Sequence, residues 1–234
     1  NRPPNGTVGD LALELLLQTW SANIRFRQVL SPKWTQKYGI TAQYQDNQKS
    51  GFDYLLPNFR TLRSGVYALL ENQLSARFQL TYGLRLDYAN NNTESHEQAI
   101  YIDNGITTLS LNSPATNSHF MNFSAATGLW YAIKPDEWIF RAHLGKSFRV
   151  PYPSETVSNG VHHGTFRHEL GTANLESEQG YQLDIGTDWR KKGWEVEVAG
   201  FFNYFKNYIY LSPTARFSPL PDAGQLYQYL QTDA

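Results

Sequence analysis

Residues 178–210 decide the fold, and they read EQGYQLDIGTDWR, then KKG, then WEVEVAGFFNYFKNYIY. Apolar and polar side chains alternate along both arms, and successive side chains of a strand point to opposite faces. Each arm therefore has one apolar and one polar face, and Lys191-Lys192-Gly193 connects them tightly. Soluble strands usually have about five or six residues. Here the alternation exceeds about ten residues per arm, the length of a tilted strand that crosses a bilayer.

The same alternation recurs from Trp20 onward, and the connections between the arms alternate in length. The short connections lie near 31–33, 73–75, 134–136 and 191–193, and the long ones are 46–60, 89–118, 150–177 and 211–225. We expect a local hairpin around 98–111, and either a short helix or a strand end at 11–17. Short turns on one side and long loops on the other are typical of outer-membrane barrels.

Tryptophans gather near the short turns. Trp34, Trp138, Trp189 and Trp194 lie within a few residues of one, and Trp130 is not far away. Indole favours the membrane interface, with its apolar ring in lipid and its N–H among the headgroups. We therefore expect these side chains to form an aromatic girdle on the periplasmic side. The alternative is that they fill the core of a soluble protein.

Composition favours a membrane barrel over a helical membrane protein. The 234 residues are 15% aromatic and 18% charged, with a mean hydropathy of −0.51. No stretch approaches the roughly 20 apolar residues that a membrane helix needs, whereas alternating strands fit these values. The net charge of −1 gives no indication of nucleic-acid binding, and the lack of cysteine excludes disulfides and thiolate metal sites. Without an initiator Met or a signal peptide, and with an end inside a strand-like pattern, the chain is expected to be a piece of a longer protein.

The sequence thus predicts an all-β fold, an antiparallel meander of long strands that is part of a transmembrane β-barrel. About nine or ten strands are expected, each paired with its neighbours in sequence and none parallel. The residues expected to face lipid are Leu80, Tyr82, Leu84, Ile185 and Val198. The residues expected to line the barrel interior are Arg25, Arg27, Arg77, Arg85, Asp87, Arg141, Asp184 and Asp188.

Several short motifs lie between 139 and 210. They are Phe148-Arg149-Val150-Pro151, Ser154-Glu155, Gly160-Val161-His162-His163-Gly164-Thr165, Glu169-Leu170-Gly171, Asn174-Leu175 and Glu178. Together with the flanking strands, this run resembles the barrel of a TonB-dependent outer-membrane receptor. Looser similarity extends the resemblance to about residues 20–210.

The resemblance implies that residues 1–234 form one partial barrel domain. Receptors of this family have 22 strands around a plug, so the plug, the segment that contacts TonB and about half the barrel would lie outside this chain. The family's fold implies TonB-driven import of a scarce nutrient such as an iron chelate (a siderophore complex), haem, cobalamin, a metal or a glycan. It also implies a location in the bacterial outer membrane. The partners would be membrane lipid, the TonB complex through the missing plug region, and a small-molecule or metal-chelate ligand; no nucleic acid, cofactor or enzymatic activity is expected.

The loop at 150–177 carries the candidate ligand-binding residues, which are Tyr152, His162, His163, Arg167, His168 and Glu169. Imidazole and carboxylate groups suit zinc, copper or haem iron, although the sequence leaves the metal unknown. If the cargo is an organic chelate or a glycan, Tyr152, Phe166 and Arg167 would contact it instead, and the histidines would serve the loop's structure. Arg149 is expected to pair with a carboxylate inside the barrel, next to a proline that ends its strand.

Two other functional classes remain open from the sequence. One is a small complete outer-membrane barrel that acts as an enzyme or adhesin, and the other is a soluble β-protein that binds carbohydrate through exposed aromatic side chains. Catalysis finds little support, because no Gly-x-Ser-x-Gly motif and no phosphate-binding glycine loop occur. A complete barrel is also expected to end on an aromatic residue, and the last residue is Ala234.

Overall fold

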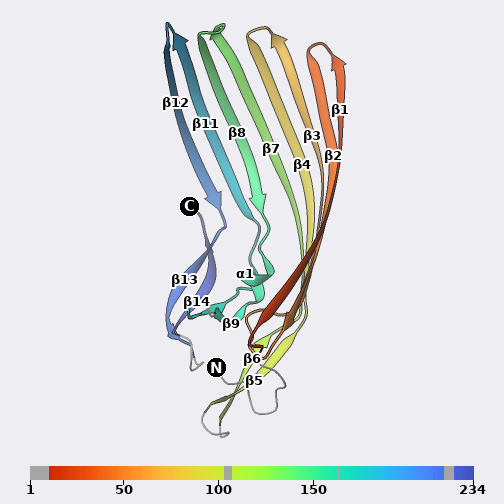
Figure 1. Cartoon of the computed structure of the whole chain (residues 1–234), viewed down its shortest axis with the longest axis vertical. Coiled ribbons are helices and arrows are strands. Elements are labelled where there is room, and N and C mark those ends of the chain that lie inside the picture. The colour runs from red at the N-terminus through yellow and green to blue at the C-terminus, as the bar shows by residue number, and fades with distance from the viewer. Residues whose placement is uncertain (1–10, 103–106, 163, 219–223) are drawn as a thin grey trace.

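The computed structural model describes residues 11–102, 107–162, 164–218 and 224–234, whose strands form three sheets (Figure 1). The main sheet contains eight antiparallel strands in the order β1 (Glu14–Ser31), β2 (Trp34–Ser50), β3 (Phe59–Ser75), β4 (Phe78–Thr93), β7 (Thr116–Lys134), β8 (Trp138–Arg149), β11 (Glu178–Lys191) and β12 (Trp194–Lys206). The predicted antiparallel meander of long strands is therefore confirmed. β1 and β12 lie at its two edges, so these strands form an open, curved sheet (Figure 1).

Shorter elements occupy the loop end of the sheet. A second sheet contains β13 (Tyr208–Phe217), β14 (Gln225–Thr232), β10 (Arg167–Leu170) and β9 (Asn159–His162), and a separate hairpin pairs β5 (His96–Ile102) with β6 (Thr107–Ser113). The helix α1 (Pro153–Val157) directly follows β8. Within the described ranges no helix is long and apolar enough to cross a membrane.

The strand count and one pairing differ from the sequence prediction. Fourteen strands occur in the described residues rather than nine or ten, because the long loops themselves contain short strands. One of these pairings is parallel: β10 runs alongside β14, with His168 opposite Leu226. The expectation that no strands are parallel is therefore wrong at this place, where the β9–β10 hairpin folds back against a strand distant in sequence.

Several predicted boundaries also shift. The first long connection shrinks from 46–60 to 51–58, because β2 and β3 extend further than the alternation indicates. The hairpin expected around 98–111 is confirmed as β5–β6. Residues 211–217 of the loop expected at 211–225 are strand, since β13 continues to Phe217. At 11–17 the structure has the beginning of β1 rather than a helix.

The second arm of the hairpin at 178–210 is also shorter than the sequence predicts. β12 ends at Lys206, and β13 starts at Tyr208 in the other sheet. Asn207 between them has φ 57, a left-handed conformation that asparagine tolerates better than most residues. Its backbone N–H donates to Asp233 Oδ1 at 3.0 Å, and its side-chain amide donates to Glu176 Oε2 at 2.8 Å. These bonds hold the bend that separates the two sheets.

The main sheet has one apolar and one polar face. Cross-strand register keeps the two faces distinct: Leu84 pairs with Ala68 and Ala125, while neighbouring Arg85 pairs with Tyr67. The five residues expected to face lipid share the apolar face, where Leu84 is 55% and Val198 60% exposed. Their contact with lipid stays a prediction.

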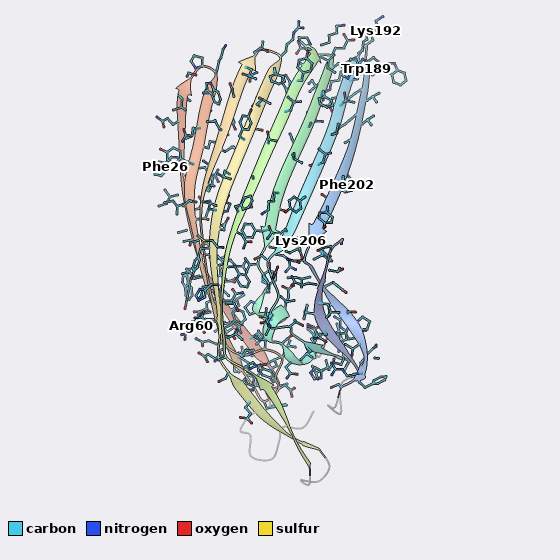
Figure 2. The ribbon with its side chains drawn as sticks, turned by 180° about the vertical axis from the view of Figure 1, so that it is seen from behind. Phe26, Arg60, Trp189, Lys192, Phe202 and Lys206 are labelled. Atoms are coloured by element: carbon cyan, nitrogen blue, oxygen red, sulfur yellow. The ribbon has the colours of Figure 1, made fainter. Side chains whose placement is uncertain are left out.

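Four of the five tryptophans near the short turns lie on the apolar face, and Figure 2 shows Trp189 at that end of the sheet. Trp130 is the exception, because it pairs with Gln79 and Arg141 and so lies on the polar face. The prediction that Trp130 belongs to the aromatic girdle is therefore wrong, because its position in the alternation places it on the polar face, next to the outward-facing Leu129 and Tyr131.

The buried apolar core lies at the loop end rather than along the main sheet. Its members include Tyr54, Leu56, Val150, Val157, Val161, Leu175, Ile209 and Leu226, each at most 8% exposed. They come from the 51–58 connection, the loop after β8 and the second sheet. The long strands thus carry a compact cap of short elements at one end.

Candidate functional site

Arg149, at the end of β8, ties this cap to the main sheet. Its Nη1 donates to both carboxylate oxygens of Glu155 in α1, at 2.9 and 2.8 Å, and its Nη2 donates to Glu178 Oε2 at 3.0 Å. The same Glu178 oxygen accepts the backbone N–H of Ile209 in β13 at 3.0 Å. The expected pairing of Arg149 with a carboxylate on the polar face is confirmed, and it links four elements. We call these residues the Arg149 node.

Tyr152 lies just beyond this node and remains accessible. Its backbone N–H donates to Glu155 Oε2 at 2.8 Å, which fixes the start of α1, while the residue is 47% exposed. The guanidinium carbons of Arg63 and Arg149 lie 5.4 and 5.6 Å from the centre of its ring. Such contacts between a cation and an aromatic face are attractive. Tyr152 is therefore held between two cations and still faces solvent.

Arg63 is the site residue that sequence reasoning missed. It lies on the polar face of β3, opposite Gln43 and Ala89. Its Nε and Nη2 atoms are buried, and neither has a hydrogen-bond partner among the residues that the structure describes. Donor atoms buried without a partner are costly, so an anion that reached this guanidinium would relieve that cost. The sequence signal was weak, because the alternation at 61–72 is less regular than in the neighbouring strands.

The other arginines near Arg63 are neutralised. Arg85 donates from Nε to both oxygens of Asp87, at 2.9 and 2.7 Å, and from Nη2 to Thr41 Oγ1 at 2.7 Å. Arg63, Arg85 and Arg149 all line one open hollow of about 590 Å³ on the polar face. Among these three cations, only Arg63 has no ion pair in the described part of the chain.

His168 has a structural environment rather than an open one. It is 2% exposed, with Nδ1 2.8 Å from Ser218 Oγ and Nε2 3.0 Å from Asn159 Oδ1. Burial lowers the pKa of this imidazole, which favours the neutral ring. In that form Nε2–H donates to the Asn159 oxygen and Nδ1 accepts the Ser218 hydroxyl. Both ring nitrogens are then occupied.

Glu169 is also engaged within the cap. The Tyr229 hydroxyl donates to its Oε2 at 3.2 Å, and Arg167 Nη2 lies 3.6 Å from its Oε1. Burial, followed by the negative charge of Glu169, raises the pKa of Tyr229 to about 12. Arg167 also lies over the ring of Tyr227, with its guanidinium carbon 5.2 Å from the ring centre. These contacts hold β10 against β14.

The remaining predicted residues surround an exposed turn. His162 is exposed, and its Nδ1 lies 3.3 Å from Thr165 Oγ1. Phe166 is 69% exposed in a left-handed conformation, and His163 lies outside the described residues. Within the described ranges, no three histidine or carboxylate side chains gather closely enough to hold a metal ion. Here the accessible groups are therefore Tyr152, His162 and Phe166, whereas His168 and Glu169 are packed inside the cap.

One family model matches nearly the whole chain. Residues 3–234 match the family model described as TonB dependent receptor-like, beta-barrel. The hemophore receptor HasR of Serratia marcescens, solved as a double mutant with its hemophore HasA and heme, has a TM-score of 0.74 and 18% identity over 95% of this chain and 38% of that one. The copper transporter OprC has a TM-score of 0.74 and 16% identity over 94% and 34%.

A third similar structure is the FrpB iron transporter of Neisseria meningitidis, with a TM-score of 0.60 and 18% identity over 92% of this chain and 31% of that one. This chain therefore spans between 31% and 38% of the length of these three structures. No curated protein matches it in sequence. At these identities the solved structures establish the shared fold and leave the ligand open.

Proposed function

Because the chain belongs to the TonB-dependent receptor-like β-barrel family, we propose that it forms part of a bacterial outer-membrane receptor that imports a scarce nutrient. Barrels of this family reside in the bacterial outer membrane. Energy would come from the TonB complex, through a plug region outside this chain. The long strands with one apolar and one polar face support this proposal, since the apolar face would contact lipid and the polar face would line the interior.

The class of ligand is inferred from Arg63, which has no ion pair among the described residues and lies beside Tyr152. A guanidinium recognises carboxylate and other anionic oxygens through paired N–H groups, and the exposed tyrosine ring offers an adjacent flat apolar surface. A cargo that fits both is a negatively charged organic molecule with a planar part. Haem, with its carboxylates, and ferric siderophore complexes belong to this class.

The alternative is direct coordination of a metal or haem iron by His162, His163, His168 and Glu169. It requires His168 to give up the hydrogen bond at one of its two ring nitrogens and Glu169 to leave the Tyr229 hydroxyl. The organic-ligand proposal requires neither change. His162 remains a candidate for a contact at its exposed turn, and His163 remains one from the sequence alone.

The test uses the intact receptor and a panel of ferric siderophore complexes, haem, copper and cobalamin. Arg63→Leu removes the unpaired cation. The matched control is Arg60→Leu on the same strand. Arg60 is three positions from Arg63 and so lies on the other face of β3, where its Nε is 3.6 Å from Asp46 Oδ2. A lost charge-assisted hydrogen bond costs roughly 1.5–3 kcal/mol, so we expect Arg63→Leu to weaken binding of the cognate ligand at least tenfold and Arg60→Leu to leave it unchanged.

A further variant tests the metal alternative, the double variant His162→Ala with His163→Ala. If the cargo is an organic chelate, its affinity should be unchanged; if the cargo is coordinated through imidazole, binding should be abolished. If Arg63→Leu and Arg60→Leu bind every ligand equally well, the assignment of Arg63 to the ligand site is wrong. If the intact receptor accumulates no member of the panel in a TonB-dependent manner, the import proposal itself fails for these nutrients.

A further inference from the structure

The apolar face of the main sheet carries one charged side chain within its apolar belt. The belt extends from the tryptophans near the short turns to a row of tyrosines near the loop end, Tyr44, Tyr88, Tyr181 and Tyr204. Of the described outward-facing residues between those limits, only Lys146 is charged. It pairs with Ala125 and Tyr181, in line with Leu144 and Phe140 on β8. A charge on such a surface is costly near the bilayer centre, so the cost of Lys146 depends on its distance from that centre.

Lys146 lies near the loop-side edge of the belt. It is eight positions after Trp138 along β8, which corresponds to about 26 Å of strand at roughly 3.3 Å per residue. With the strand tilt of about 35–45° found in such barrels, this is about 20 Å of membrane thickness, compared with an apolar band about 25 Å tall. A lysine at this height reaches the headgroup layer with its ammonium while its alkyl chain stays among apolar neighbours.

The immediate surroundings of the Lys146 ammonium leave two of its N–H groups available. Nζ lies 3.7 Å from the centre of the Phe123 ring and donates to the Phe123 carbonyl oxygen at 3.0 Å. No carboxylate pairs with it in the described part of the chain. The ammonium is thus fixed over an aromatic ring with its charge uncompensated.

Lys206 is a second cation on the same face. It pairs with Gln179, two positions before the Tyr181 that neighbours Lys146. Two strand spacings and two residues place the Lys146 and Lys206 Cα atoms about 12 Å apart. Figure 2 shows Lys206 at the end of β12 remote from Lys192. The Asp233 carboxylate nearby accepts the Tyr204 hydroxyl at 3.4 Å and the Asn207 N–H at 3.0 Å, and Lys206 has no ion pair among the described residues.

We propose that Lys146 and Lys206 form a binding site on the membrane-facing surface for the phosphate groups of anionic lipid headgroups in the outer leaflet. Ammonium groups bind phosphate as compact point charges. The Tyr181 and Tyr204 rings, tilted by 31° with their centres 6.1 Å apart, provide apolar contact below the headgroup. The site lies on the face opposite the Arg63 hollow. It rests on the membrane location and not on the identity of the cargo.

The test measures lipid retention by the intact receptor in nanodiscs. One set contains phosphatidylcholine alone, and the other contains phosphatidylcholine mixed with phosphatidylglycerol, whose phosphate charge is not balanced within the headgroup. Inorganic phosphate is added as a separate competitor. The variants are Lys146→Met alone, Lys206→Met alone, and the two together. The control is Lys37→Met, because Lys37 lies on the polar face of β2 and pairs with Glu71.

Each basic side chain near an anionic surface contributes about 1 kcal/mol, which is about fivefold in affinity. We therefore expect phosphatidylglycerol enrichment around the wild-type receptor, about fivefold weaker retention for each single variant and about 25-fold for the pair. Lys146→Arg should retain binding, and Lys37→Met should resemble the wild type. Methionine on a lipid-facing surface is compatible with folding, and the two single variants provide independent readings if the double variant assembles poorly.

Three results would overturn the proposal. The first is equal retention of phosphatidylglycerol by the wild type and both single variants. The second is an equal loss of phosphatidylcholine, because that would show general lipid contact rather than recognition of an anionic phosphate. The third is displacement of the lipid by inorganic phosphate at equimolar concentration, because that would assign the site to a free ion.

Discussion

Replacement of Arg149 by Met should release the cap from the main sheet. The two carboxylates that Arg149 bridges are largely buried, with the Glu155 and Glu178 side chains 12% and 11% exposed. Removal of one partner from a buried ion pair costs about 3–5 kcal/mol, because the remaining charge is left without compensation. The Arg149 side chain is itself 31% exposed, so water screens part of this effect and the lower end, about 3 kcal/mol, applies.

The assay is hydrogen exchange in the intact receptor, followed at the Ile209 amide, which donates to Glu178. A loss of about 3 kcal/mol in local stability should raise its exchange rate roughly hundredfold. The control is Arg190→Met, since Arg190 and Glu195 form an ion pair at 2.6 Å with 61% and 64% exposed side chains. Exposed pairs of this kind contribute about 0.2–1 kcal/mol. If Arg149→Met exchanges no faster at Ile209 than Arg190→Met, the node does not anchor the cap.

Three further predictions concern the strand faces, the buried imidazole and a close backbone contact. Leu84→Arg should lower the free energy of unfolding by about 2–4 kcal/mol and hinder assembly of the intact receptor if residue 84 lies near the bilayer midplane. The native Arg85 next to it is tolerated because it lies on the other face. Normal heat-modifiable migration of the variant would refute this prediction. The pKa of His168 is lowered in the folded cap, so the folded cap binds fewer protons than the unfolded one. Its stability should therefore be full above pH 6.5 and fall as the pH drops towards the folded pKa. If a His168→Phe variant shows the same pH-dependent hydrogen exchange in β10, His168 is not the cause of the pH dependence. Gly160→Ala should destabilise the cap by about 1–3 kcal/mol, because its new methyl group would collide with a backbone carbonyl, whereas Gly200→Ala has free space and should be neutral in a melting experiment.

The long strands could be predicted from the sequence because the alternation of side chains is a local property. Every outward position of β4 from Phe78 to Tyr88 is apolar, and the same holds for β12 from Trp194 to Tyr204 except at Gly200. The period of two defines both the strand and its faces without any knowledge of its neighbours. The same locality explains the boundary errors, because the end of β2 is polar on both faces and resembles a loop.

The cap could not be predicted in the same way, because its elements depend on contacts between distant segments. The parallel pairing of β10 with β14 joins residues of the loop expected at 150–177 to a strand near the end of the chain. Gly160 must pass so close to Tyr54 that no side chain fits, and Asn159 donates its N–H to the Leu55 carbonyl at 3.0 Å. A single sequence shows the glycine and the asparagine but not the partners that make them necessary.

The candidate site likewise could be predicted only as far as local sequence shows it. Histidine and glutamate in one loop indicate metal chemistry by residue type alone, yet the partners of His168 stand 9 and 50 positions away, and these decide that its imidazole is buried and hydrogen-bonded. Arg63 presents the reverse case, since nothing in its local sequence distinguishes it from the neutralised arginines of the polar face. Its availability follows from which carboxylates other arginines have already bound, Asp87 for Arg85 and Glu155 with Glu178 for Arg149. A binding site on a polar sheet face is therefore defined by the charges that remain unpaired, and that property emerges only when the strands are placed side by side.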